Sequence, residues 1–317
     1  MHNARSADAD VLVDAARRLV VATEDAYDLA EGPLWDPVRS VLLWVDITAG
    51  RVQEAVLRPG GTLDVVGQEQ FGGTVGAVAI GPGRELLAAV GGRLVVRSRD
   101  GDRSFGPELV PGGSGRRLND GKPDPAGRFV VGTLALDGTS ESESLMTVAG
   151  DETVRTLDDD LSLANGLAWS ADGTLFYTVD TLRQTVFVRP YDVESGATGP
   201  RSVFTQLDHG FPDGICVDGT GCVWVAVWGA GAVNRYSSDG SLLDVIDVPA
   251  PHVSSVAFAG ADLETLVITT AKQDLSRDQL RAFPLSGRLF TCVPGPRGLL
   301  QPRWAGPIPA DDSSKGQ

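Results

Sequence analysis

Short apolar segments alternate with turns along almost the whole chain. Each unit has a short apolar strand, a turn such as Asp172-Gly173 or Asp218-Gly219, and a second strand rich in Val, Leu and aromatic residues. Six such units start 41 to 48 residues apart, at Gly32, Gly76, Gly121, Gly166, Gly214 and Ser255. A period of about 45 residues is typical of the four-stranded blades of a propeller. The pattern therefore predicts six blades.

The second strand of each unit is apolar on both faces, as residues 129–136 and 223–229 illustrate. A strand between neighbouring blades needs this composition because both of its faces are buried. A parallel α/β alternative would need helical segments of about 10 to 15 residues between strands, and the gaps here contain turn residues instead. We therefore expect an all-β protein, a six-bladed β-propeller with four-stranded antiparallel blades.

The repeats also divide the chain. Residues 1–16 are predicted to be an N-terminal extension, and the one helix that we expect lies before the repeats, at about 8–18, with Ser6 as its cap. Residues 17–308 are predicted to form a single propeller, in which residues 17–25 supply the outer strand that closes the last blade. Residues 309–317 are predicted to be a disordered tail.

Composition narrows the classes of partner. The chain has 317 residues, 42% of them hydrophobic, and a net charge of −15, which disfavours nucleic acid and anionic lipid surfaces. It has no apolar run of about 18 residues and no secretory signal, so we expect a cytoplasmic protein without a membrane span. Its cysteines lack metal-ligand or disulfide-framework spacing and are Cys216, Cys222 and Cys292.

One repeat position is unusually polar. The innermost strand of every propeller blade runs along the central channel, so equivalent positions form a ring. The residues before the aligned positions are Glu31, Val75, Asp120, Asn165, Asp213 and Ser254. Buried carboxylates are costly unless they are paired or bind a cation.

An oxygen ligand set of Glu31, Asn165 and Asp213 suits Ca²⁺, Mg²⁺ or Mn²⁺, and it accepts Zn²⁺ without selecting it. The alternative is that the Asx-Gly pairs are simple turn residues. Glu31 is not a turn former, so the register-matched set favours a metal in the central channel. For Asp120 we favour a structural role.

Four long segments resemble the SMP-30/gluconolactonase/regucalcin-like family of six-bladed propellers: AEGPLWDP, RLNDGKPDPAGRFVVGTL, ANGLAWSADGTLFYTVDT and FPDGICVDGTGCVWVAVWGAGAVNRYSSDG. The resemblance runs from about residue 31 to residue 306. It implies that Glu31, Asn165 and Asp213 hold one divalent cation and that Asp213 doubles as the catalytic base. It also implies that Arg117 contacts the oxygens of the substrate and that Asn119, next to the metal, contacts the substrate or metal-bound water.

The activity that the resemblance implies is hydrolysis of a sugar lactone or a related cyclic ester. The cation polarises the carbonyl while Asp213 assists the attack of water. Ca²⁺ is the ion that we expect first, and Zn²⁺, Mn²⁺ and Mg²⁺ are the alternatives. The expected partner is a small-molecule lactone, and the expected assembly is a monomer or a weak homodimer.

Three alternatives stay open. Two are a phosphotriesterase or other ester hydrolase on the same scaffold and a non-enzymatic calcium-binding regulator. A channel ion would be hidden from a protein partner, which argues against the regulator. A metal-free condensing enzyme of the strictosidine-synthase type is disfavoured because all three metal ligands are present.

Loop residues are weaker candidates. Many sugar lactonases carry an acidic residue after the strand that corresponds to GTLALDG, where it bonds substrate hydroxyls. Asp137 is predicted to bind substrate on this ground, with Glu141 and Glu143 as alternatives. The sixth unit has AKQDLS where relatives often have an ARDG-like segment, which puts a simple aldonolactone in doubt. Side chains expected in loops, at the rim or in blade packing are Lys122, His209, Phe211, Trp228 and His252.

Overall fold

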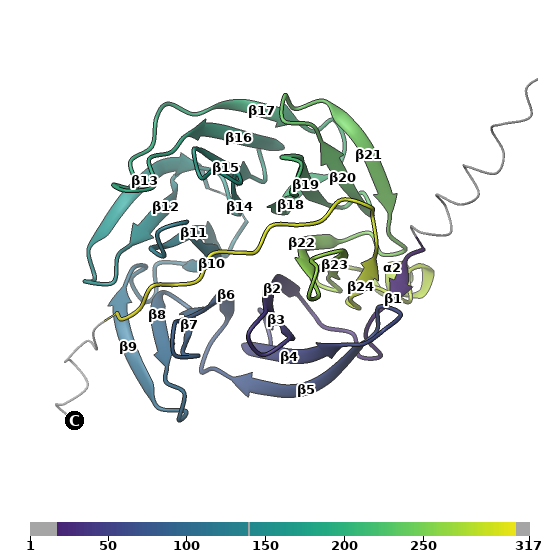
Figure 1. Cartoon of the computed structure of the whole chain (residues 1–317), viewed down its shortest axis with the longest axis horizontal. Coiled ribbons are helices and arrows are strands. Elements are labelled where there is room, and N and C mark those ends of the chain that lie inside the picture. The colour runs from purple at the N-terminus through teal and green to yellow at the C-terminus, as the bar shows by residue number, and fades with distance from the viewer. Residues whose placement is uncertain (1–17, 139, 309–317) are drawn as a thin grey trace, which may run out of the picture.

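The computed structural model describes residues 18–138 and 140–308 and confirms the predicted six-bladed propeller (Figure 1). Six four-stranded antiparallel sheets are arranged around a central axis. The predicted N-terminal extension and the predicted tail lie outside the described residues, and so does all but the last residue of the helix expected at 8–18. No helix in the described ranges is long and apolar enough to cross a membrane.

Each blade runs from an innermost strand outward. The first three blades are β2 (Ala30–Asp36), β3 (Val41–Asp46), β4 (Arg51–Leu57) and β5 (Leu63–Gln70); β6 (Val75–Ile80), β7 (Leu86–Val90), β8 (Arg93–Arg97) and β9 (Arg103–Glu108); and β10 (Arg116–Pro123), β11 (Phe129–Ala135), β12 (Glu143–Val148) and β13 (Val154–Leu161).

The other three are β14 (Ala164–Trp169), β15 (Leu175–Asp180), β16 (Thr185–Pro190) and β17 (Ser202–Gln206); β18 (Phe211–Val217), β19 (Val223–Trp228), β20 (Ala232–Tyr236) and β21 (Leu242–Asp247); and β22 (Val253–Ala259), β23 (Thr265–Thr270), β24 (Phe290–Cys292) and β1 (Val20–Val21).

The N-terminal strand closes the ring. Val20 of β1 lies opposite Thr291 of β24, so the start of the propeller supplies the outermost strand of blade 6, as predicted. Closure of this kind removes the open edge between the first and last blades.

The core lies between blades, and the second strands show why their composition is apolar throughout. On β11, Phe129 and Val131 pack with Leu87 of blade 2, whereas Val130 packs with Trp169 of blade 4. Successive side chains of a strand point to opposite faces, so both faces of β11 are buried between neighbouring blades. The three cysteines are all buried.

All six innermost strands contain a β-bulge near the polar ring position. The register shifts follow Glu31, Val75, Leu118, Asn165, Pro212 and Val253. A bulge bends a strand and changes the direction of a side chain, and bulges are common beside active sites. The Asx-Gly pairs of the ring lie inside β10, β14 and β18, so the alternative interpretation of them as turn residues is wrong.

Glycine after the ring position allows neighbouring inner strands to approach. A Cβ on Gly166 would lie 2.3 Å from the Asp213 carbonyl oxygen, and one on Gly214 would lie 2.5 Å from the Ser255 Cβ. A side chain at either position would push two blades apart. The repeated glycine therefore keeps the ring narrow at the height of the polar side chains.

The sixth blade contains a helix that the repeat pattern did not predict. Helix α2 (Arg277–Ala282) begins after Ser276, whose hydroxyl accepts from the Gln279 backbone in a capping box. Our prediction of helix only before the repeats is thus wrong. The sequence signal for this helix is Ser276-x-x-Gln279. It begins at the last residue of AKQDLS, the segment that departs from the repeat.

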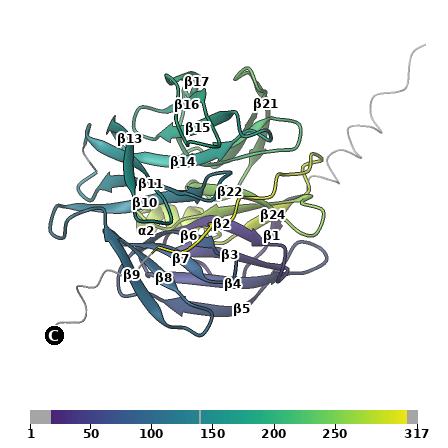
Figure 2. The same ribbon diagram turned by 60° about the vertical axis from the view of Figure 1, so that its left-hand side comes forward.

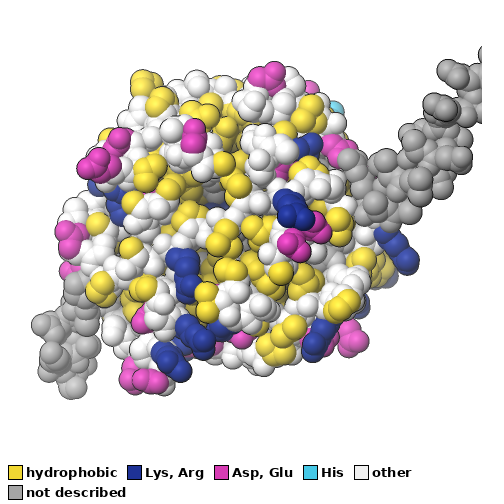
Figure 3. Space-filling model, viewed as in Figure 1, with side chains coloured by type: hydrophobic (Ala, Val, Ile, Leu, Met, Phe, Trp, Pro, Cys, Tyr) yellow, Lys and Arg dark blue, Asp and Glu magenta, His cyan; other side chains and the backbone are white. Residues whose placement is uncertain are grey.

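Residues 299–308, the last that the structure describes, form a strap across one face of the propeller (Figures 1 and 2). The strap bonds to blade 2 through Trp304 N and Ile80 O, 3.0 Å apart, and to blade 3 through Ala305 N and Gly127 O, also 3.0 Å apart. Hydrophobic side chains gather around the central part of this face (Figure 3). The strap therefore covers one end of the channel.

Candidate active site

A cavity of about 260 Å³ lies at the other end of the channel, where the innermost strands begin. Leucine, isoleucine and aromatic side chains form much of its wall. Its polar lining is Glu31, Arg117, Asn119, Asn165, Thr181, Asp213, Gln273 and Asp274. The structure thus brings together every residue predicted for the site except Asp137, which is not part of this lining.

The three predicted metal ligands come from three blades. Glu31, Asn165 and Asp213 lie near the starts of β2, β14 and β18, beside the bulges, and are 5%, 8% and 6% exposed. Their convergence follows from the repeat because equivalent positions on inner strands lie at one height. An oxygen-lined floor of this kind can bind a proton or a cation.

Burial disfavours negative charge on these carboxyl groups. Burial is the main cause that raises the pKa of Glu31 well above its usual value, and repulsion by Asp213 and Asp120 adds to the rise. Burial, then repulsion by Asp120, raises the pKa of Asp213 to about 8, although hydrogen bonds to Glu31 and Asn165 and the charge of Arg117 oppose this. The cluster therefore favours a bound proton or added positive charge.

Asp120 occupies the adjacent ring position. Its Oδ1 accepts from the Gly121 backbone N at 2.8 Å, whereas its buried Oδ2 has no hydrogen-bond partner. Burial raises its pKa, and the positive charge of Lys122 lowers it. Asp120 thus adds a third buried carboxyl group to the channel, and one of its oxygens has no hydrogen-bond partner.

The donor set fits a hard divalent cation. Within residues 18–138 and 140–308, no three Asp, Glu, His or Cys side chains converge tightly enough to hold a metal by themselves. A cation at Glu31 and Asp213 would therefore need the amide oxygen of Asn165 as its third protein ligand. Carboxylate and amide oxygens are the ligands that Ca²⁺ and Mg²⁺ prefer.

Arg117 and Asn119 are on β10 and lie beside the carboxyl groups of Glu31 and Asp213. Arg117 Nη1 donates to Asn119 Oδ1 at 2.8 Å, and Asn119 Nδ2 donates to the Ala164 carbonyl oxygen at 3.0 Å. Burial lowers the pKa of Arg117 to about 10, while the charges of Glu31 and Asp213 act in the opposite direction. Asn119 thus holds a charged donor at a fixed place in the cavity.

Thr181 orients Asn165, although no sequence pattern marks it as a site residue. Thr181 Oγ1 donates to the Pro212 carbonyl oxygen at 3.0 Å and accepts from Asn165 Nδ2 at 3.2 Å. The amide nitrogen is engaged on this side, and Oδ1, which accepts from the Gly166 backbone N at 3.2 Å, has a second lone pair that a cation can use. Thr181 directly follows β15 and comes near the ring only through the antiparallel pairing of β14 with β15.

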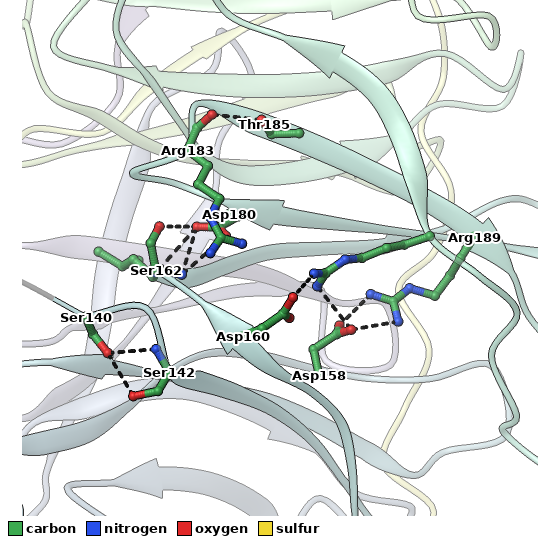
Figure 4. Close-up of polar contacts among 11 residues, drawn as sticks. Ser140, Ser142, Asp158, Asp160, Ser162, Asp180, Arg183, Thr185 and Arg189 are labelled. Atoms are coloured by element: carbon green, nitrogen blue, oxygen red, sulfur yellow. Dashed lines mark hydrogen bonds and ion pairs between the residues drawn. The ribbon is translucent and has the colours of Figure 1, made fainter.

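A hydrogen-bond network behind the wall supports these loops (Figure 4). Asp180 accepts from the Ser162 backbone N at 3.2 Å and pairs with Arg183 at 3.3 Å. Loops 162–163 and 181–183, which it joins, carry the cavity residues Leu163, Thr181 and Leu182. This network holds both loops in place.

Aromatic side chains form the wall on the blade 5 side. Phe211 and Trp228 line the cavity, and Trp228 stacks on His252 with ring centroids 4.1 Å apart. His252 Nδ1 lies 2.9 Å from the Gln273 carbonyl oxygen, and burial lowers the pKa of this imidazole. His252 and His209 are not part of the cavity lining, so His252 supports the wall from behind.

Acidic loop residues are placed differently from the expectation. Glu143 is fully buried and bonds Arg116 at 2.7 Å and Thr133 at 2.6 Å, which occupies it in a structural pair. The hydrogen bond and charge of Glu143 raise the pKa of the Arg116 guanidinium, and the charge of Asp137 adds to the rise. The polar groups that do reach the cavity from a loop are Gln273 and Asp274, in the sixth-unit segment that departs from the repeat.

A second cavity, of about 330 Å³, lies at the strap end of the channel. Its lining includes Lys122, Trp169, Cys216 and the strap residues 299–302. Burial raises the pKa of the Cys216 thiol to about 12, so this thiol is neutral and a poor nucleophile. The paired carboxyl groups therefore make the first cavity the candidate active site.

Known proteins match nearly the whole chain. A 6-deoxy-6-sulfogluconolactonase of Pseudomonas putida is 35% identical over 88% of this chain and 95% of that protein. A pentonolactonase of Haloferax volcanii is 37% identical over 78% of this chain and 82% of that protein. Among solved structures, the calcium-binding protein regucalcin from Agrobacterium tumefaciens has a TM-score of 0.85 and 30% identity, covering 92% of this chain and 98% of that one.

The family match covers all six innermost strands. The family described as the SMP-30/gluconolactonase/LRE-like region matches residues 29–272, which include Glu31, Arg117, Asn165 and Asp213. The fold, the cavity and the relatives agree with this match. The chain belongs to the SMP-30/gluconolactonase/LRE-like family.

Proposed function

We propose that the protein is a lactonase that uses one divalent cation, with Ca²⁺ as the expected ion. Glu31, Asn165 and Asp213 would hold the cation, and a small-molecule lactone would occupy the cavity above them. The observation that carries the proposal is the pair of buried carboxyl groups, with a register-matched amide, on the floor of an open cavity. Relatives named sulfogluconolactonase and pentonolactonase support the reaction class.

When bound, the cation supplies positive charge that polarises the lactone carbonyl. Asp213 accepts a proton from the attacking water as the new C–O bond forms. The ring C–O bond then breaks, and Asp213 returns the proton to the departing alkoxide. The product is a hydroxy acid, and the side chain of Asp213 is again a carboxylate. Arg117 and Asn119 hold substrate oxygens in place during these steps.

The polar rim suits a hydroxylated lactone. Asp274 and Gln273 are both part of the cavity lining, and Gln273 Nε2 donates to Asp274 Oδ2 at 3.2 Å. A side-by-side assay of aldonolactones, bulky apolar lactones and organophosphates tests this assignment. Although the sixth unit departs from the repeat, its Gln273 and Asp274 add polar groups to the cavity lining, so we expect turnover to be highest on the aldonolactones. Faster hydrolysis of the organophosphates would favour the phosphotriesterase alternative.

Thr181→Val is expected to weaken Ca²⁺ affinity by about 10- to 100-fold, the usual effect of losing a group that orients a metal ligand. Valine matches threonine in volume but cannot hold Asn165 Nδ2. Calorimetric titration of the chelator-treated protein measures the loss. The matched control is Thr185→Val in the same blade, which removes only the bond to the Arg183 carbonyl. Equal affinities for the two variants would contradict the role of Thr181.

Cation-free protein is expected to lose thermal stability as the pH rises from 5 to 8. The pKa of Asp213 is about 8 in the folded protein and near 3.8 when unfolded, so the folded state binds more protons between these values. Raising the pH removes that advantage. Because protons compete with the cation, the increase in Tm on adding Ca²⁺ should grow from pH 5 to pH 8 by about 5 °C or more. A Ca²⁺ effect independent of pH in differential scanning calorimetry would contradict the prediction.

A further inference from the structure

Lys122 lies in the channel below the proposed cation site. It is on β10, three residues beyond Asn119, and also lines the cavity under the strap. Its Nζ donates to the Leu167 carbonyl oxygen at 2.9 Å and to the Ile215 carbonyl oxygen at 2.7 Å. One ammonium group therefore joins the inner strands of blades 3, 4 and 5.

The two acceptors have matching positions. Leu167 lies two residues beyond Asn165 on β14, and Ile215 lies two residues beyond Asp213 on β18. These strands belong to different sheets, so no backbone ladder fixes the distance between them. The Lys122 bonds supply a link that the sheets do not.

The charge of Lys122 has a second effect. Asp120 Oδ2 is buried without a hydrogen-bond partner, and Lys122 is the group whose positive charge favours its ionised form. An ammonium at this place thus compensates a buried carboxylate while it bonds two carbonyl groups. A neutral side chain of the same length would do neither.

We infer that Lys122 is a positioning residue that sets the separation of Asn165 and Asp213, and thereby the discrimination of the site between cations of different size. The inference rests on the proposed cation site. Oxygen ligands lie at about 2.3–2.6 Å from Ca²⁺ and at about 2.0–2.1 Å from Mg²⁺. A small change in strand separation therefore affects the two ions differently.

The ratio of Ca²⁺ to Mg²⁺ affinity isolates this geometric role. Removing the Lys122 charge changes the electrostatic potential equally for two ions of the same charge, so that effect cancels in the ratio. A change in ligand spacing does not cancel. The ratio, measured by calorimetric titration of the full-length chain, is thus the informative quantity.

Lys122→Met keeps the length of the side chain and removes the ammonium. We expect the Ca²⁺ to Mg²⁺ affinity ratio to change by at least about fivefold. The matched control is Arg128→Met, because Arg128 of blade 3 also donates to two carbonyl groups of blade 4, those of Val193 at 2.5 Å and Glu194 at 3.0 Å. Val193 and Glu194 lie outside the lining of the candidate active-site cavity, so we expect the ratio for Arg128→Met to stay within about twofold of wild type.

Chemical rescue, in which an added amine replaces the missing ammonium, separates the effect of the Lys122 charge from that of its packing. It can be measured even if Lys122→Met folds poorly. Lys122→Ala leaves a space beside the strap-end cavity, through which a small amine can enter. Propylammonium should return the affinity ratio to within about twofold of wild type, and propanol of similar size should not.

An unchanged ratio in folded Lys122→Met, or equal effects of the two additives, would overturn the inference while leaving the proposed function intact. Wild-type protein that binds neither Ca²⁺ nor Mg²⁺ would overturn the proposed cation site and this inference with it.

Discussion

Asp213→Asn is expected to lower kcat for lactone opening by at least about 10³-fold. A positioned general base contributes about 10²- to 10⁴-fold, and the substitution also removes one charged ligand from the proposed cation site. Asparagine has nearly the same shape as aspartate and offers an oxygen ligand, but it cannot accept the proton of the attacking water. Titration of released acid at saturating aldonolactone measures kcat.

The matched control is Asp208→Asn, which removes an exposed carboxylate from the loop before β18, five residues from Asp213. This variant should keep the wild-type rate within about twofold, because surface substitutions away from a site usually have small effects. If Asp213→Asn retained a tenth or more of the wild-type rate, its role as the base would have to be abandoned.

Removal of the divalent cation is expected to reduce lactone opening by at least about 10²-fold. Without added positive charge, Asp213 has a pKa of about 8 and the carbonyl lacks its polarising group. Dialysis against a chelator, followed by elemental analysis of the protein, prepares the cation-free form. Restoring one equivalent of Ca²⁺ should restore the rate.

A chelator saturated with Ca²⁺ before use serves as the control for direct inhibition. It should leave the rate unchanged. Full activity in a sample that elemental analysis shows to be free of divalent ions would refute the requirement for a cation.

The architecture was predictable because a propeller repeats one local pattern. Each unit carries its own turns, and its second strand has to be apolar on both faces, as Val130 and Val131 illustrate. The ring position follows from the same repeat, so Glu31 and Asp213 were predicted to converge. The N-terminal strand was predictable since residues 17–25 contain strand-forming residues without a unit of their own.

Contacts between blades were not predictable from the repeat. Thr181 reaches Asn165 through strand pairing and reaches Pro212 across a blade boundary, and neither distance has a local sequence signal. The same applies to Lys122, which the sequence assigned to loop or blade packing and which the structure places in the channel. Glycine at Gly166 looked like a turn signal, whereas its function is close approach of two strands.

Loops departed most from expectation because they lie outside the repeat. Asp137 is not part of the cavity lining, and its contact with substrate stays a prediction. Gln273 and Asp274 reach the cavity from a segment that departs from the repeat. The domain boundaries, the cytoplasmic location and the assembly as a monomer or weak homodimer likewise stay predictions from the sequence.

The most direct test of a one-cation lactonase is a Ca²⁺ titration of chelator-treated protein in which bound ion and lactone turnover are measured in the same samples. We expect bound ion and turnover to rise together and to saturate at one ion per chain, and neither to do so in Asp213→Ala. Turnover at full rate without bound ion would contradict the account. Saturable Ca²⁺ binding without turnover of any lactone would contradict it equally and would favour the calcium-binding regulator.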